Sequence, residues 1–394
     1  MTSKWDLLIQ CEVGTSYPRY YQINPVATDI GTHNISIYLK NYAGQLVDKK
    51  VCELVIKSAP TNPSSMKRIA VFGDSLTQGG QWVTETVRRL LSSDGATPTM
   101  PAGNGLTNVK FIGAMGSDNA KYYGVGGWGW SNYATEGKPA FRFQVTGVTT
   151  VVKGTKYTNN GFEYIIQENN TTEGVGNILC STSASTNVPQ ASGNLTKVSG
   201  SGSGDDTITF TSVAADVTNP LWNGTKVSFI KYLSDINEPS VDCAMFLLGW
   251  NEISAGKDVI ESYIHTILDS LHTEFPNAVC KLIGLQLPSL NGGLGANYGA
   301  SGIYSDKVSL IKMVYEYNEF LMGIAASDTY SSFVEYVDVA SQFDSENNMP
   351  ETEVQVNTRN AKTEYLGTNG VHPATSGYYQ IADVMWRNIV KTFC

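Results

Sequence analysis

The stretch that decides the fold is Lys67-Arg-Ile-Ala-Val-Phe-Gly-Asp-Ser-Leu-Thr77, an apolar run that ends in glycine, aspartate and serine. A short continuous run of this kind is typical of a strand that is buried on both faces in a parallel sheet. The next segment, residues 81–91, has apolar residues at helical spacing. The sequence therefore predicts a buried strand followed by a helix, with Ser75 at the connection between them.

The same alternation of strand and helix continues toward the C-terminus. It predicts a doubly wound α/β sheet of parallel strands, covered by helices on both faces. The expected strands are 108–115, 241–249, 278–287 and 332–339, and the expected helices are 257–275, 304–324 and 377–393.

Two further segments have short alternating runs that are typical of half-buried strands. Residues 1–60 predict a small N-terminal β-sandwich, and the Pro/Ser-rich residues 61–66 predict a linker. Residues 141–231, rich in Thr, Asn, Gly and Ser, predict an inserted β-domain in preference to a disordered linker. Residues 67–140 and 232–394 are expected to close into one α/β domain, because surface insertions cost little loop-closure entropy.

The charge balance argues against two classes of partner. Only 16% of the residues are charged, against about 25% in typical domains, and the formal net charge is -9. A net-negative chain without a basic cluster has no electrostatic footprint for nucleic acid or for anionic lipid. We therefore expect neither a nucleic-acid nor a membrane partner.

The cysteines and the N-terminus give weaker information. The six cysteines are scattered, without metal-ligand spacing, so we expect no metal, and Cys11 with Cys52 is the one pair left open as a disulfide. The first residues lack the apolar core of a signal peptide. Met1 is either an expression start after a removed leader or the start of a protein exported by another route, and the expected location is extracellular, cell-surface or virion-associated.

Ser75 and His372 are the candidate catalytic pair. A serine at the carboxyl end of a buried strand lies where open α/β sheets hold ligands, although it could also simply cap the following helix. His372 stands in Asn369-Gly-Val-His-Pro373, just before the last predicted helix. A serine nucleophile needs an imidazole to take its proton, and the other histidines, His33, His265 and His272, are less well placed.

Four blocks in this order resemble the GDSL or SGNH hydrolases, a family of serine esterases. They are Gly-Asp-Ser-Leu at 73–76, a glycine-rich block at 123–128, Gly-Trp-Asn at 249–251, and the His-Pro block. The resemblance covers about 67–133 and 241–394 and implies a flavodoxin-like three-layer fold without a cofactor. It implies Ser75 as nucleophile, His372 as base, and an oxyanion hole of the Ser75 N–H, the Gly127 N–H and the Asn251 side chain, with Gly126 as an alternative register to Gly127.

The chain departs from the family pattern at two positions. Glu252 stands where the family usually has Asp, a change that keeps the charge. Asn369 stands where the family has the Asp of its triad. An asparagine can orient His372 through its carbonyl oxygen but cannot stabilise an imidazolium by charge, so either the site is weakened or Asp344 or Glu364 supplies the carboxylate.

Aromatic residues beside the blocks, with few charges around them, favour a neutral, hydroxyl-rich ligand over a long acyl chain. Trp128, Trp130 and Trp250 are the expected substrate-binding residues, although about half of such aromatics are expected to be core residues. The leading hypothesis is a serine esterase that removes O-acyl, chiefly O-acetyl, groups from carbohydrate. The alternative is a glycan-binding or adhesion protein of a cell or phage surface with a weakened hydrolase site; a lipase is the third choice.

Overall fold

A computed structural model describes residues 5–17, 20–93, 101–184, 186–289 and 307–394. The chain divides into two compact units, residues 1–61 and 62–394. Met1 and the next three residues, and the first three residues of the helix expected at 304–324, lie outside the described ranges.

The first unit consists of antiparallel β-structure. Its three-stranded sheet has the order β1-β4-β5, and the turn between β4 and β5 forms where Asn41 Oδ1 accepts from the N–H groups of Ala43 and Gln45. A separate ribbon of two-residue strands is the only other sheet among its described residues. The elements are β1 (Trp5–Gln10), β2 (Thr15–Ser16), β3 (Tyr21–Gln22), η1 (Ala27–Asp29), β4 (Gly31–Asn41) and β5 (Leu46–Ile56).

A seven-stranded sheet is the centre of the second unit, with the order β18-β17-β16-β6-β9-β8 and with β7 also paired to β6. All described pairs in it are parallel except β8 with β9. The predicted strand at 67–73 is central, and its residues from Ile69 to Phe72 are fully buried. The strands are β6 (Lys67–Gly73), β7 (Val109–Ile112), β8 (Met115–Ser117), β9 (Ala120–Gly124), β16 (Cys243–Leu247), β17 (Val279–Ile283) and β18 (Val334–Val337).

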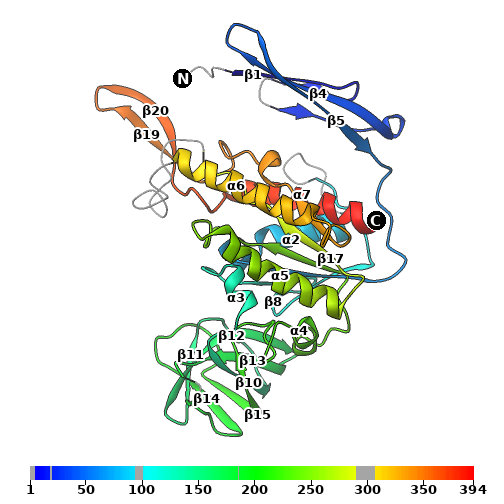
Figure 1. Cartoon of the computed structure of the whole chain (residues 1–394). Helices are drawn as coiled ribbons and strands as arrows, with labels where there is room; N and C mark the ends of the chain where they lie inside the picture. The colour runs from blue at the N-terminus through cyan, green and yellow to red at the C-terminus, as the bar shows by residue number, and fades with distance from the viewer. Residues whose placement is uncertain (1–4, 18–19, 94–100, 185, 290–306) are drawn as a thin grey trace. The chain divides into compact units, whose positions relative to one another are not determined.

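Helices cover both faces of this sheet, which confirms the predicted three-layer α/β fold. α2 packs along α7, while α5 contacts α3 and α4 and crosses in front of the sheet in Figure 1. The helices are α1 (Ser75–Gln78), α2 (Gln81–Leu91), α3 (Trp130–Ala134), α4 (Phe229–Asp235), α5 (Lys257–Glu274), α6 (Lys307–Ala326) and α7 (Thr375–Phe393), with a short turn η3 (Ala340–Gln342).

The insertion is a closed barrel with the strand order β10-β13-β12-β11-β14-β15. Alternate residues such as Phe143, Tyr164 and Phe210 are buried inside it, as the alternating pattern predicts. Its strands span 139–217, whereas the predicted insertion ran over 141–231, and the barrel belongs to the same compact unit as the sheet. The strands are β10 (Pro139–Thr146), β11 (Lys156–Asn159), β12 (Phe162–Thr172), β13 (Val175–Ser181), β14 (Gly193–Lys197) and β15 (Thr207–Val217).

A buried ion network joins the barrel to α4. The Arg142 guanidinium, 8% exposed, contacts Glu168 at 3.1 Å, Asp216 at 2.7 Å and Asp235 of α4 at 3.1 Å. Lys231 contacts Asp216 at 3.1 Å and Asp235 at 2.6 Å. Because three carboxylates surround one arginine away from water, each depends on the others for charge compensation.

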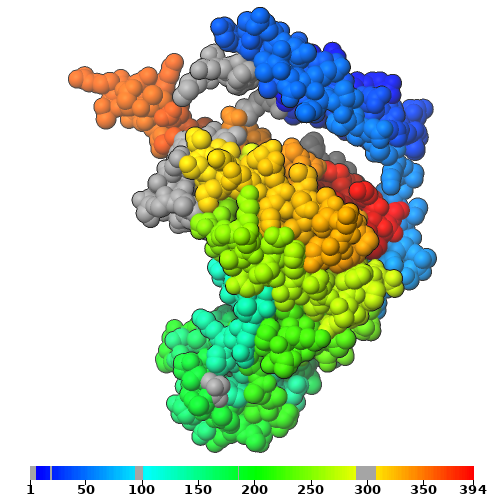
Figure 2. Space-filling model, in the orientation of Figure 1, coloured from blue at the N-terminus to red at the C-terminus, as the bar shows by residue number. Residues whose placement is uncertain are grey.

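The stretch 340–371, which shows no clear periodicity in the sequence, contains a hairpin of β19 (Glu351–Asn357) and β20 (Asn360–Gly367). Figure 2 shows it in orange as a narrow projection. Nearly all of its residues are exposed, so no buried face imposed the apolar alternation that reveals a strand in a sequence.

No disulfide forms between Cys11 and Cys52, since all six cysteines are free thiols. Among the described residues, no helix is long and apolar enough to span a membrane, and no cluster of metal-ligating side chains occurs.

We expect Arg142→Ala to lower the free energy of unfolding by about 3–5 kcal/mol, because it leaves buried carboxylates without a counter-charge. Chemical denaturation followed by circular dichroism measures the change. Lys156→Ala is the matched control, since its ion pair with Glu163 is 46% and 45% exposed and is worth at most about 1 kcal/mol. Equal effects in the two variants would show that the network does not hold the barrel to α4.

Candidate active site

Ser75 lies where β6 ends and α1 begins, at the carboxyl edge of the sheet. Asp74 caps α1, and its Oδ1 accepts a hydrogen bond of 2.9 Å from the Leu76 N–H. The turn is tight: a Cβ at Gly73 would lie 2.1 Å from Thr77 Oγ1. The glycine therefore permits the turn that leaves the Ser75 side chain partly exposed while its neighbours Asp74 and Leu76 are buried.

His372 is the side chain that meets Ser75. Its Nε2 lies 2.8 Å from Ser75 Oγ, across 297 positions of the sequence. It stands in the turn that precedes α7, and burial lowers the pKa of its imidazole. The neutral imidazole, the form that can accept a proton, is therefore favoured down to a lower pH than for a solvent-exposed histidine.

Asn369 is placed as the third residue of the group, but its amide points in the unexpected direction. Its Oδ1 accepts hydrogen bonds from the backbone N–H groups of Val371 at 3.0 Å and His372 at 2.9 Å. Its Nδ2 is consequently the atom that faces His372 Nδ1, at 3.3 Å. The expectation that the carbonyl oxygen orients the imidazole is therefore wrong, because two backbone donors already occupy that oxygen.

The amide brings no negative charge to His372. A general base needs its proton on Nδ1 and a lone pair on Nε2 toward the serine, and a carboxylate at position 369 would stabilise the imidazolium that forms. The NH2 that faces Nδ1 can only donate hydrogen bonds, so Asn369 supplies neither that charge nor an acceptor for an Nδ1–H.

The two alternative carboxylates are engaged or placed elsewhere. Asp344 Oδ1 accepts from the N–H groups of Glu346 and Asn347, both at 3.1 Å, and so closes its own turn. Glu364 lies exposed in β20. The structure thus gives neither of them the place beside His372 Nδ1, which Asn369 occupies.

The glycine-rich second block passes beside Ser75. Gly126 donates its N–H to Gln78 Oε1 at 2.6 Å, so this N–H is already used. Gly127 has a φ of +81°, a left-handed conformation that favours glycine, and a Cβ built on it meets nothing within 4 Å. Of the two registers, the structure therefore favours Gly127 as the residue whose N–H can serve an oxyanion.

Asn251, from the third block, uses its side-chain NH2 within the site. Its Nδ2 donates to Trp128 O at 2.8 Å and lies 3.5 Å from Asp74 Oδ2. Both hydrogens of the amide therefore have acceptors, and Asn251 must turn away from one of them to serve an oxyanion. Burial raises the pKa of the Asp74 carboxyl to about 7 against the opposing effect of the Leu76 N–H, so Asp74 is partly protonated near neutral pH.

Glu252 has a role that the sequence did not reveal. Its carboxylate accepts from the Trp130 N–H at 2.7 Å and the Ser131 N–H at 3.1 Å, and also from the Ser131 hydroxyl. It thereby caps α3 and fastens the second block to the third. A Cβ at Gly129 would lie 2.2 Å from Glu252 Cδ, so the glycine there makes room for this contact.

Two of the three predicted substrate-binding tryptophans are core residues, which corrects that prediction. Trp130 is 0% and Trp250 3% exposed. Trp130 donates its Nε1–H to Tyr317 OH at 2.7 Å and packs on Phe246, so it cannot contact a ligand. Trp128 remains partly exposed, with its ring 5.0 Å from that of Tyr133.

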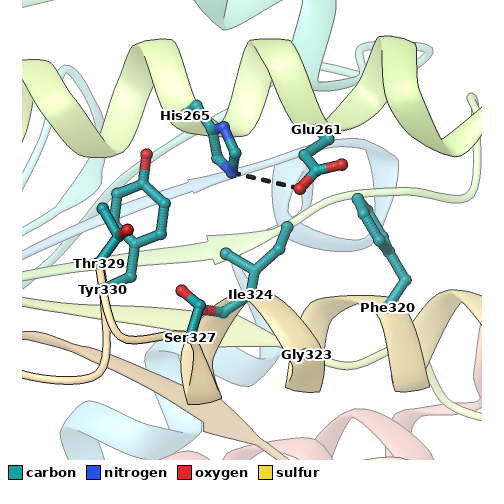
Figure 3. A pocket seen from close by; sticks show the side chains of 8 residues that line it. All are labelled: Glu261, His265, Phe320, Gly323, Ile324, Ser327, Thr329 and Tyr330. Atoms are coloured by element: carbon teal, nitrogen blue, oxygen red, sulfur yellow. Dashed lines mark hydrogen bonds and ion pairs between the residues drawn. The ribbon is translucent and has the colours of Figure 1, made fainter.

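A separate hollow of about 460 Å³ lies between α5 and the end of α6 (Figure 3). His265 lines it, 3.6 Å from Glu261 and with its ring 5.0 Å from that of Tyr330. Ser327, also in its lining, donates its hydroxyl to Ile324 O at 2.8 Å and is not paired with the imidazole. This hollow shares no lining residue with the Ser75 site, and its geometry gives no activated nucleophile.

A parallel α/β sheet of three layers, with all four blocks gathered at one edge, is the SGNH-type fold that the sequence predicts. No protein-family model matches the chain, and no curated protein matches it. Solved structures similar to it include a carbohydrate esterase of family 3 from Talaromyces cellulolyticus, at 12% identity over 83% of this chain and 98% of that chain, with a TM-score of 0.38. A family 3 carbohydrate esterase from Clostridium thermocellum is 13% identical over 83% of this chain and 98% of that chain, with a TM-score of 0.35. A peptidoglycan O-acetylesterase is 11% identical over 83% of this chain and 92% of that chain, with a TM-score of 0.34.

We expect Glu252→Ala to destabilise the protein by about 1–3 kcal/mol, because it leaves the donors of Trp130 and Ser131 without their acceptor. Denaturant unfolding measures the loss. Glu136→Ala, a change of the same kind at an exposed position, is expected to stay within about 0.5 kcal/mol. A Glu252 variant as stable as this control would show that the cap does not hold the two blocks together.

Proposed function

We propose that the protein is a serine esterase that acts through an acyl-Ser75 intermediate. The observation that carries the proposal is the contact of 2.8 Å between Ser75 Oγ and His372 Nε2 at the carboxyl edge of the sheet. In this mechanism His372 takes the Ser75 proton as Oγ attacks the ester carbonyl, and returns it to the departing alcohol. Water then attacks the acyl group by the same route.

The Ser75 and Gly127 N–H groups are the proposed oxyanion donors. Each such donor contributes about 10²- to 10³-fold in rate when it is aimed at the developing charge. Asn251 joins them if its amide leaves Trp128 O or Asp74 when the ester binds. A transient change of this sort is compatible with the exposed position of Asn251.

We propose an O-acetyl ester on a carbohydrate as substrate, and a location outside the cell or on a cell or virion surface. The low charge of the chain and its neutral polar β-modules support this choice. Because Trp130 and Trp250 are buried, Trp128 is the one predicted tryptophan that can still contact the sugar.

A second candidate function is glycan binding by a hydrolase-like domain with little turnover. The specific observation in its favour is that an amide, and not a carboxylate, faces His372 Nδ1, at 3.3 Å, so position 369 brings no charge to stabilise an imidazolium. Labelling of Ser75 separates the two functions, because only an activated serine reacts with a fluorophosphonate.

For the esterase we expect stoichiometric fluorophosphonate labelling at Ser75 and measurable hydrolysis of p-nitrophenyl acetate and acetylated sugars. Ser75→Ala should lose both while keeping its circular dichroism spectrum, since the nucleophile is gone and the buried strand is untouched. Ser327→Ala, at the separate hollow, is the control and should keep both. Unchanged turnover in Ser75→Ala would overturn the assignment, and glycan binding without labelling would favour the second function.

We expect Asn369→Asp to raise kcat by up to about 10⁴-fold, the factor by which the opposite change lowers it in a serine-protease triad. The carboxylate keeps the two backbone hydrogen bonds and accepts a hydrogen bond from Nδ1–H, which leaves the Nε2 lone pair for the Ser75 proton. It also raises the pKa of His372, so the acid limb of the kcat/KM profile moves to higher pH. In the unaltered chain that limb lies below the usual imidazole value, because burial lowers this pKa.

The pH profile also tests whether a gain in rate in Asn369→Asp comes from the reaction itself or only from better folding. An improvement that came only from better folding would leave the acid limb in place. A loss of activity in Asn369→Asp would show that the amide has a positive role in the reaction.

A further inference from the structure

Gln286 is a buried amide that contacts the segment carrying His372. It lies just beyond the end of β17, and its side chain is 0% exposed. Its Nε2 donates a hydrogen bond of 2.6 Å to Val371 O, the carbonyl of the residue that precedes His372. Gln286 therefore connects the end of a sheet strand to the backbone beside the histidine, across 85 positions of the sequence.

This contact holds one side of the peptide group between Val371 and His372. The carbonyl of that group accepts from Gln286, while its N–H donates to Asn369 Oδ1 at 2.9 Å. The C=O and N–H of a trans peptide point in opposite directions within one plane. Two side-chain amides from different parts of the chain therefore fix this plane from both sides. Pro373 restricts the backbone beyond His372, because a residue before proline avoids the helical region.

The segment that carries Gln286 is itself fixed to α6. Asn318 Oδ1 accepts from the Leu285 N–H, and Asn318 Nδ2 donates to Leu285 O, both at 2.8 Å. Gly284 donates its N–H to Val337 O at 2.9 Å, which continues the pairing of β17 with β18. The Gln286 side chain therefore starts from a backbone that is hydrogen-bonded at the two preceding residues, and it extends this support to Val371.

The hydrogen bond to Val371 is the one described polar contact of the Gln286 side chain. Its Oε1 is buried and has no hydrogen-bond partner within the described part of the chain. Loss of the amide therefore acts through the peptide group before His372 and through no second polar contact. This makes the position suitable for a test that separates support of the histidine from general packing.

We propose that Gln286 is a positioning residue for His372, and that its amide sets the distance and direction of the imidazole relative to Ser75. The inference rests on the proposed esterase function. His372 Nε2, now 2.8 Å from Ser75 Oγ, must stay within hydrogen-bond reach while the proton moves. A displacement of about 1 Å at such a site costs about 10²-fold in rate.

The first test is Gln286→Met, which removes the donor and nearly keeps the length of the side chain. We expect kcat for p-nitrophenyl acetate to fall by about 10- to 10²-fold. KM should change by less than about twofold, because a fully buried side chain cannot contact the ester. The rate of fluorophosphonate labelling at Ser75 should fall by the same factor as kcat, since it needs the same proton transfer.

A second variant, Gln286→Glu, tests the hydrogen bond itself. A neutral carboxyl group can donate to Val371 O, whereas an ionised one cannot. The ratio of its kcat to that of the unaltered chain at the same pH should therefore be near one at acidic pH. The ratio should fall as the pH rises through the pKa of the new carboxyl, which burial raises. Circular dichroism at each pH checks that the variant stays folded.

Leu271→Ala is the control for a loss of stability alone. Leu271 is buried near the end of α5, in the part of the chain that leads into the start of β17. This variant should unfold at a lower denaturant concentration and keep its kcat.

A folded Gln286→Met variant with the kcat of the unaltered chain would overturn the positioning role. If Gln286→Met does not fold, Gln286→Glu decides, and a kcat ratio that does not change with pH would overturn the role. An unaltered chain that shows neither labelling nor hydrolysis would instead overturn the esterase assignment itself.

Discussion

The hydrogen bond between Ser75 and His372 is the constraint on which the site depends, because it joins residues 297 positions apart. It can form only if β6 and the turn before α7 reach the same edge of the sheet. The parallel order of β16, β6 and β9 brings the ends of these strands together, with Phe72 and Phe246 stacked 5.1 Å apart beneath the site. The barrel leaves this arrangement intact, because its first and last strands pair with each other and return the chain close to where it left.

Much of this arrangement was predictable from the sequence because it depends on burial. A strand such as β6, with residues 69–72 fully buried, must be apolar at every position, and α2 and α5 must have an apolar side toward the sheet. The order of the blocks then placed Ser75 and His372 together. Glycines 73 and 127 were recognisable for a different reason, since a tight turn or a left-handed conformation leaves few other residues possible.

The features that could not be predicted depend on which way a side chain points and on contacts between distant segments, not on a pattern of apolar residues. Trp130 and Trp250 belong to blocks that reach the site, yet their rings point into the core, and the composition of a block does not reveal which way a ring faces. The exposed hairpin β19–β20 has no apolar face to reveal it. The capping contact of Glu252 joins two blocks far apart in the chain, and only the folded structure shows that α3 begins beside it.

At Asn369, one side-chain atom shapes the local turn and the other faces His372. The oxygen that shapes its turn is common to asparagine and aspartate, since either can accept from the N–H groups of Val371 and His372. The second atom of the group makes no contribution to that turn, but it faces His372 Nδ1, where an amide NH2 can only donate a hydrogen bond and a carboxylate oxygen can only accept one. The turn can therefore hold either group, and His372 stays 2.8 Å from Ser75 although position 369 carries no charge. Distances between heavy atoms alone would class this site as a complete catalytic group, whereas the chemistry of the amide shows that position 369 lacks the charge that stabilises an imidazolium.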